Sequence, residues 1–396
     1  MLCTVDTVII GGGAMGSATA WQLARRGRDV LLLERFGPGH TNGASHGASR
    51  NFNVAYADET HLGMLVEALP LWRELEAETG ESLLDLTGIA NHGPNPEFAR
   101  VAEAQTRAGI ANEFLTVDEA QGRWPGIRFD TTVLFNADAG RLNADRSVAA
   151  LQTSAARAGA TVHHNTRVLE VTILGPTEVR VRFDSGDGEQ VVTANNVVLT
   201  AGAWTEKLFS PLAADLGVTL PTLTVTQEQP AHFAVRDEGI DWPGFNHSPG
   251  TGVGPGAGAG PAAIAGAGDD YRYWYSGIYG MFTPGQGVKA GWHGVGPQLD
   301  PDERTFQPEP VQLAALQQYA RDWLPGVDAD DFTAISCTYT TTVDSAFVLD
   351  RVGPVVVGAG FSGHGFKFTP VIGRILADLV DESRPAPELF SLTRQR

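Results

Sequence analysis

The chain has 396 residues, of which 42% are hydrophobic, and its formal net charge is −18. This length supports a sizeable core and favours two domains over one small domain. The acidic balance argues against nucleic acid and anionic membranes as partners, because both require a basic face. A small substrate is not excluded, since a binding site can be locally basic on an acidic protein.

The N-terminus has neither a basic start nor a long apolar stretch, so no signal peptide is predicted. No run of about 18 apolar residues is present, and we therefore expect no membrane span. The two cysteines, Cys3 and Cys337, are too far apart to suggest a disulfide framework or a metal-binding spacing. We expect a cytoplasmic protein with reduced thiols and no bound metal.

The first elements form a strand–helix–strand unit. Val5–Ile10 is a mostly apolar run, typical of a buried parallel strand. Ala14–Arg26 contains helix-forming residues and is followed by a glycine, a common helix terminator. Val30–Leu33 is a second buried strand. Residues 37–50 are rich in Gly, Ser and His and are predicted to form a loop.

Further elements follow from residue periodicity and composition. Helices are predicted over His61–Glu78, Ser147–Ala158 and about Thr369–Val380. Strands are predicted over Thr166–Val171, Glu178–Phe183, Val197–Ala201 and Val355–Val357. Residues 216–335 are strand-like and aromatic-rich. Within them, residues 248–268 are of low complexity and are predicted to form a surface insertion, which we consider a candidate lid.

A glycine pattern lies between the first strand and the first helix. Gly11, Gly13 and Gly16 form G-x-G-x-x-G, which permits a tight turn, close approach of a pyrophosphate and close helix packing. The helix N-terminus favours phosphate groups, and Glu34 ends the second strand where a carboxylate can bind an adenosine ribose. This context predicts a dinucleotide site, but it does not separate FAD from NAD. A glycine-rich turn without a ligand is the alternative.

Residues 358–368, GAGFSGHGFKF, lie between a predicted strand and a predicted helix. Backbone amides, the helix N-terminus and Lys367 can direct positive charge at a bound group. Such charge suits the pyrimidine edge of a flavin, which becomes negative on reduction. A structural turn with a solvated lysine is the alternative interpretation of this segment.

Four motifs relate the chain to a known family. They are HTNGASHGASR (40–50), KAGWH (289–293), CTYTTTVD (337–344) and GFSGHGFKF (360–368). With these motifs the chain resembles monomeric sarcosine oxidase and N-methyltryptophan oxidase, FAD-dependent amine oxidases of the D-amino-acid-oxidase-like superfamily. The resemblance implies FAD held covalently by a cysteine through the 8α-methyl group of the flavin. Cys337 stands at that position, although a lone cysteine is more often an inert buried residue.

The expected fold class is α/β. A Rossmann-type FAD-binding domain is predicted from residues 1–85, 145–215 and 336–396, and a β-rich α+β substrate domain from residues 86–144 and 216–335. Residue spacing adds two local predictions. Cys337 and Tyr339 share one face of a strand-like run, and so do Lys289 and His293. For the second pair, an outward solvated face is the alternative.

The resemblance also implies roles for individual residues. Lys289 is expected to promote oxygen reduction, and His293 is expected to lie beside the substrate, with His46, Arg50 and Lys367 completing the catalytic group. The expected FAD contacts are Gly11, Gly13, Gly16, Glu34, Arg50, Val168, Cys337, Gly363, Gly365, Phe366 and Lys367. The expected substrate contacts are Asn53, Tyr56, Tyr279, Tyr339 and Lys367.

One position departs from the family pattern. Sarcosine oxidases have a second arginine three residues after the loop arginine, and it helps to bind the substrate carboxylate together with the lysine of the GFK motif. Here Asn53 takes that place after Arg50. Asparagine offers only neutral donors, so we expect sarcosine to be a poor substrate and the natural amine to be bulkier or anchored differently.

The sequence thus predicts a monomeric oxidase that converts a secondary amine, such as an N-methyl amino acid, to an imine while O2 becomes H2O2. An oxidase of a bulkier or cyclic amine, of the N-methyltryptophan, pipecolate or glycated-amine type, is the first alternative. An NAD-dependent dehydrogenase and a flavin-binding protein without catalysis are alternatives of other classes.

Overall fold

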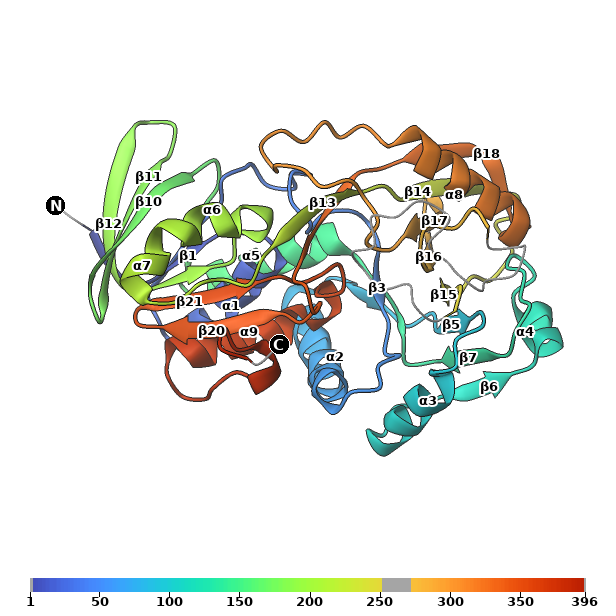
Figure 1. The fold of residues 1–396 in the computed structure, drawn as a ribbon. Coiled ribbons are helices and arrows are strands. Elements are labelled where there is room, and N and C mark those ends of the chain that lie inside the picture. The colour runs from blue at the N-terminus through green and yellow to red at the C-terminus, as the bar shows by residue number, and fades with distance from the viewer. Residues whose placement is uncertain (1–2, 251–271, 395–396) are drawn as a thin grey trace.

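The computed structural model describes residues 3–250 and 272–394. Figure 1 shows two groups of strands side by side, each with helices packed on it. The N-terminal elements (blue) and the C-terminal elements (red) lie together in one group, as the sequence predicted. Most of the predicted insertion, residues 251–268, lies outside the described residues. Within them, no helix is both long and apolar enough to cross a membrane.

The first sheet contains the predicted strand–helix–strand unit. Its eight strands are β1 (Cys3–Ile10), β2 (Val30–Leu33), β9 (Thr161–His163), β10 (Arg167–Gly175), β11 (Glu178–Asp184), β12 (Glu189–Leu199), β20 (Val348–Val352) and β21 (Val355–Ala359). β1 lies between β2 and β12 and is parallel to both, while β21 runs parallel to β12 on its other side. The first and last parts of the chain therefore share one sheet.

Four long helices pack with this sheet. They are α1 (Ala14–Arg25), α2 (Glu59–Thr79), α5 (Ala144–Arg157) and α9 (Thr369–Val380). α1 contacts both α5 and α9, and α2 packs on α9. Trp21 of α1 and Trp72 of α2 are fully buried in the core that these helices share with the sheet. α2 begins at Glu59 because the side chain of Asp58 accepts a hydrogen bond from the backbone N–H of His61.

The second sheet also has eight strands. They are β18 (Val327–Ala334), β14 (Ala231–Val235), β17 (Gly287–Trp292), β16 (Ile278–Thr283), β15 (Gly244–His247), β5 (Ile89–His92), β7 (Val133–Asn136) and β6 (Glu113–Leu115), in spatial order. Helix α8 (Pro310–Trp323) packs on β18, β14 and β17. The core between this sheet and α8 is aromatic, with Trp274, Tyr319 and Trp323 fully buried. This matches the aromatic-rich pattern of the sequence.

Smaller elements complete the fold. β3 (Arg50–Phe52), β8 (Gly140–Leu142) and β4 (Leu84–Asp85) form one antiparallel sheet, and β13 (Thr224–Glu228) and β19 (Cys337–Thr341) form another. The remaining α-helices are α3 (Phe98–Arg107), α4 (Val117–Arg123), α6 (Thr205–Phe209) and α7 (Ala213–Leu216).

Several predicted boundaries differ from the structure, and three of them concern residues used below or the pairing of the first sheet. Arg50 was predicted to lie in the loop, but it begins β3 because its backbone pairs with β8. β12 begins at Glu189, well before the predicted start at Val197, because its antiparallel pairing with β11 extends the strand towards its N-terminus. It ends at Leu199, before Ala201. His293 was predicted to continue a strand, but β17 ends at Trp292. The boundaries of the two domains remain a prediction.

Candidate functional site

A cavity of about 940 Å³ is lined by residues from both large sheets. Its glycine-rich part comprises the segment Gly11–Met15 with Glu34 and Val168, and its cationic part comprises Arg50, Lys289, His293, Tyr339 and Lys367. The sequence-predicted site residues all line this cavity, except Gly16 and His46. The fold therefore brings together residues that are more than 300 positions apart in the chain.

Two glycines of the fingerprint are required by close backbone packing. A Cβ atom at Gly11, whose φ is +102°, would lie 2.5 Å from the carbonyl oxygen of Thr200. A Cβ at Gly16 would lie 1.9 Å from the carbonyl oxygen of Gly11, so this glycine lets α1 approach β1. Gly13 lines the cavity, and the nearest obstacle to a Cβ there is the Ser45 hydroxyl at 3.1 Å. This arrangement suits a pyrophosphate at the start of a helix.

Glu34 ends β2 and projects its carboxylate towards the same turn. Its oxygens accept hydrogen bonds from the backbone N–H groups of Gly12, at 2.6 Å, and Phe36, at 2.9 Å, and His40 Nε2 lies 3.3 Å away. Burial raises the pKa of Glu34, but the hydrogen bonds from His40 and the backbone outweigh burial and hold it below its ordinary value. The ionised carboxylate retains lone pairs for the hydroxyl groups of a ribose.

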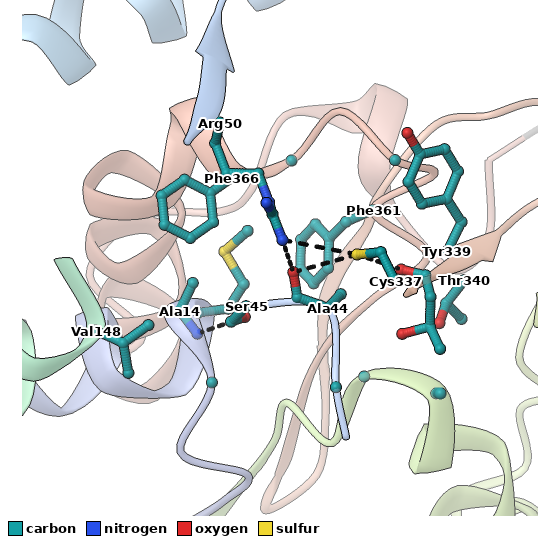
Figure 2. Close-up of a pocket in the computed structure, with 18 of the residues that line it drawn as sticks. Ala14, Ala44, Ser45, Arg50, Val148, Cys337, Tyr339, Thr340, Phe361 and Phe366 are labelled. Carbon is teal, nitrogen blue, oxygen red and sulfur yellow. Dashed lines mark hydrogen bonds between the residues drawn. The ribbon is translucent and has the colours of Figure 1, made fainter. Parts of the chain in front are cut away.

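Cys337 begins β19 and is almost buried, with 8% of its surface exposed. Figure 2 shows Arg50 extending beside Phe366 towards the cysteine sulfur. Arg50 Nη2 lies 3.6 Å from Cys337 Sγ and donates to the carbonyl oxygen of Ala44 at 3.1 Å, while Nη1 donates to Ser49 at 2.9 Å. These contacts fix a cation against the only cysteine that lines the cavity among the described residues.

Lys289 lies within β17 and points its amino group into the cavity. Nζ donates to the carbonyl oxygen of Ser49 at 3.3 Å, and the residue is only 3% exposed. Burial, together with the nearby Arg50, lowers the pKa of Lys289 to about 7. Val288 and Ala290 are buried in the second core, so neither face of this strand is solvated. The outward solvated face considered for this segment is therefore wrong.

His293 follows β17 and still reaches the cavity. Its backbone N–H is held by the carbonyl oxygen of Gly277, at 3.1 Å, and the hydroxyl of Ser276, at 2.8 Å. Its ring Nδ1 lies 3.3 Å from the hydroxyl oxygen of Tyr339. Burial, with the charge of Lys367 adding to it, lowers the pKa of His293 to about 4, so the imidazole is neutral at pH 7.

Lys367 lies in the turn Phe366–Phe368, just before α9. Trp72 Nε1 donates to its carbonyl oxygen at 3.0 Å, which fixes the turn on α2. Nζ donates to the Tyr56 hydroxyl at 2.9 Å and to the carbonyl oxygen of His364 at 2.7 Å. Burial lowers the pKa of Lys367 to about 7.

The prediction of site residues missed His364, although the residue stands in a motif that was recognised. Its Nε2 lies 3.2 Å from the carbonyl oxygen of Ser345, which can only accept, so this nitrogen carries the proton. Nδ1 is then an acceptor for the Tyr56 hydroxyl, 3.2 Å away. The sequence signal that could have identified His364 is its place near the predicted Lys367 in the same motif.

Three asparagines, Asn51, Asn53 and Asn246, also line the cavity. Asn53 Oδ1 accepts from the backbone N–H of Ala55 at 3.0 Å, so the residue turns back on its own chain. Asn51 Nδ2 donates to Asn246 Oδ1 at 3.0 Å, and the buried Asn51 Oδ1 has no hydrogen-bond partner among the described residues. Asn51 and Asn246 were not predicted, because single polar residues in loops and strands give no distinctive sequence signal.

Of two further predicted residues, Tyr279 lines the cavity and His46 does not. Tyr279 of β16 lines the cavity, and its ring centroid is 6.5 Å from that of His293. His46 is buried but does not line the cavity, and its Nε2 has no hydrogen-bond partner among the described residues. Burial and the charge of Arg50 lower the pKa of His46 to about 3.

Comparison with known proteins identifies the family. The model of the family described as FAD dependent oxidoreductase matches residues 6–379. The chain belongs to this family. The glycine fingerprint left FAD and NAD open as cofactors, and membership of this family decides for FAD. The alternative of an NAD-dependent dehydrogenase is therefore wrong.

Individual FAD oxidoreductases are similar over nearly the whole chain. Monomeric sarcosine oxidase from a Bacillus species is 31% identical, over 98% of this chain and 96% of its own. N-methyl-L-tryptophan oxidase from Salmonella arizonae is 28% identical, over 98% of both chains. The open form of a mutant of NikD, an unusual amino acid oxidase essential for nikkomycin biosynthesis, superposes with a TM-score of 0.81 at 28% identity and covers 99% of this chain and 98% of its own.

Proposed function

We propose that this protein is an FAD-dependent oxidase of secondary amines, with an N-methyl amino acid as the substrate class, and that Cys337 holds the flavin covalently. The observation that carries the proposal is that one cavity combines the glycine-rich part, the buried cysteine and two buried lysines. Curated relatives named as sarcosine and N-methyl-L-tryptophan oxidases support the substrate class.

The glycine-rich part fits the nucleotide half of FAD. Gly11 and Gly16 permit the close turn at the start of α1, and Glu34 presents an ionised carboxylate at the same turn. FAD held there would supply two-electron oxidation of the C–H bond beside the amine nitrogen, with O2 as the final acceptor, so that the amine would become an imine and O2 would become H2O2. Hydrolysis of the imine of an N-methyl amino acid releases formaldehyde and the primary amine.

The attachment to Cys337 is supported by its place in the cavity. The thiol lies on β19, whose pairing with β13 holds it at a fixed position, and Arg50 contacts its sulfur. Tyr339, two residues further on the same strand, lines the cavity as well. Cys337 would therefore hold the flavin within the cavity that the cationic part also lines.

The side chains of the cationic part are proposed to bind, orient and stabilise charge. Lys367, held by Tyr56 and His364, supplies a cation for a substrate carboxylate. Neutral His293, oriented by Tyr339, can accept a hydrogen bond from the substrate amine. The protonated form of Lys289 supplies an ammonium that stabilises negative charge developing on oxygen. Burial of the two lysines excludes water from them and strengthens these interactions.

An oxygen-electrode screen tests the proposal. Purified yellow protein is mixed with sarcosine, N-methyltryptophan, N-methylalanine, pipecolate and a glycated amine, and H2O2 is measured with peroxidase. We expect oxygen uptake and equal amounts of H2O2 with at least one secondary amine. Flavin-containing protein that consumes oxygen with none of them, and whose flavin no amine bleaches, would instead be a binding protein without catalysis.

Asn53 favours a second substrate class within the same reaction. A sarcosine oxidase is expected to bind the carboxylate with both an arginine and a lysine, but the amide oxygen of Asn53 accepts from its own backbone at Ala55. A charge-assisted hydrogen bond is worth about 1.5–3 kcal/mol, so its loss weakens binding by roughly 10- to 100-fold. A bulkier amine that gains affinity from apolar contacts is therefore the second candidate.

A further inference from the structure

We propose that His92, Asp130 and His247 form a binding site for a divalent transition-metal ion, with Zn²⁺ as the ion to test. One ligand atom from each side chain lies within 4.8 Å of the other two. The sequence predicted no metal, because that expectation depended on the spacing of the two cysteines, and this site contains none. Two imidazoles and one carboxylate are ligands that Zn²⁺ prefers.

Strand register places the two histidines side by side. His92 is the last residue of β5 and His247 is the last residue of β15. The two strands are parallel, and these residues are register partners, so their side chains project from the same face of the sheet. Their ring centroids are 3.8 Å apart. The backbone, rather than flexible side chains, therefore fixes the spacing of two of the three ligands.

The ring nitrogens of His92, which lack hydrogen-bond partners among the described residues, indicate that a ligand binds here. The side chain is fully buried, at 0% exposure, and neither Nδ1 nor Nε2 has a hydrogen-bond partner among the described residues. The ring of Phe129 packs edge-on against it. A buried polar group without a partner is costly and rare, and a coordinated ion would use the nitrogen that faces the cluster.

His247 is held in place by aromatic neighbours. The hydroxyl oxygen of Tyr319 lies 3.3 Å from its Nδ1, and Trp274 and Trp323 pack edge-on against the ring. Metal-binding imidazoles are commonly oriented by a hydrogen bond at their other ring nitrogen, and Tyr319 supplies such a contact to His247.

Asp130 supplies the negative charge of the site, and its exposure gives an ion access from solvent. It lies between α4 and β7 and is exposed, in contrast to the histidines. Zinc bonds of about 2.0–2.1 Å separate ligand atoms by roughly 3.3 Å, so the widest separation in the cluster needs to contract by up to about 1.5 Å, and the exposed carboxylate is the ligand that can move. Three protein ligands leave one position for water. The ion would join β5, β15 and the connection before β7, next to the cavity that His247 lines.

Zinc titration of the flavin-containing protein tests this site. Protein without an affinity tag is treated with EDTA, desalted and titrated with ZnCl2 by calorimetry, and metal content is measured after gel filtration. We expect one zinc ion per chain and a higher thermal midpoint with zinc, because an ion that binds only the folded state stabilises it. Zinc at far less than one equivalent per chain, with an unchanged midpoint, would overturn the proposal.

Matched variants separate this site from adventitious zinc. Asp130→Asn removes a charged ligand from an exposed position and should weaken zinc binding by at least ~10-fold. Asp138→Asn, an exposed aspartate in the turn after β7, is the control and should bind zinc like the unaltered protein. His92→Phe should abolish binding and keep an aromatic ring against Phe129. Equal zinc affinity in Asp130→Asn and Asp138→Asn would contradict the site. None of these readouts depends on amine oxidation.

Discussion

The glycine-rich and cationic parts of the cavity are built in different ways. The first depends on backbone geometry within a short stretch of sequence, where Gly11 and Gly16 permit contacts that any side chain would block. The second depends on side chains from distant segments, with Lys289 held by Ser49 and Lys367 held by Tyr56. The difference teaches that the dinucleotide fingerprint is encoded locally here, whereas the proposed substrate contacts come from side chains that are far apart in the sequence.

The largest expected effect lies at Cys337, where the two parts meet. Cys337→Ser removes the sulfur, so we expect flavin that is absent or released by acid, while the unaltered protein retains its yellow colour after acid precipitation. Cys3→Ser is the matched control, since it removes the only other thiol, and it should keep acid-stable flavin. Acid-stable flavin in Cys337→Ser would show that the attachment lies elsewhere.

Lys289→Met tests charge in the cationic part. The variant should slow reoxidation of the reduced flavin by O2 by orders of magnitude, because a fixed charge is worth a few kcal/mol and each ~1.4 kcal/mol is about tenfold in rate. Anaerobic reduction by amine should change less. Stopped-flow absorbance measures both half-reactions. Lys289→Arg keeps the charge and should recover part of the rate, while equal slowing of both steps by methionine would indicate a structural role.

The lowered pKa of Lys367 predicts a pH effect on substrates with a carboxylate. Its ammonium is present below about pH 7 and is lost as pH rises through that value. Above pH 7, kcat/KM for an N-methyl amino acid should therefore fall about tenfold per pH unit relative to a secondary amine without a carboxylate. This ratio cancels the ionisation of the amine. A ratio that is constant from pH 6 to about 9 would exclude Lys367 as the carboxylate anchor.

The smallest expected effect concerns Asn53. Asn53→Arg should raise the affinity for sarcosine severalfold, because a guanidinium can bind a carboxylate through two hydrogen bonds and an amide cannot. Asn53→Gln keeps a neutral amide and serves as the control. Steady-state KM and inhibition by a simple carboxylate measure the effect. Tight binding of sarcosine by the unaltered protein, weakened by arginine, would mean that another cation already takes this role.

The sequence predicted the elements around the glycine fingerprint more accurately than the elements whose bounds depend on tertiary contacts. Buried strands, the helix after Gly11 and the fingerprint are local patterns, and β1, α1 and β2 follow them within two residues. β12 was predicted too short because its pairing with β11 depends on tertiary contacts. His293 lies outside the predicted strand but remains in the cavity, since Ser276 and Gly277 hold its backbone.

Residues whose roles depend on tertiary neighbours were the hardest to predict. His364 becomes a candidate only when its bonds to Tyr56 and Ser345 are known. Asn51 becomes one only because its buried amide oxygen faces no partner among the described residues. The conflict at Asn53 was visible in the sequence through the resemblance, but its turn towards Ala55 was not.

An anaerobic titration of the flavin tests the central claim most directly. The purified yellow protein is mixed with an N-methyl amino acid without oxygen, and its absorbance near the flavin band is followed before air is admitted. We predict that the amine bleaches the flavin, and that oxygen restores the absorbance with one H2O2 released per flavin. A flavin that is reduced by NADH but by none of the secondary amines, or one that oxygen does not restore, would contradict the account.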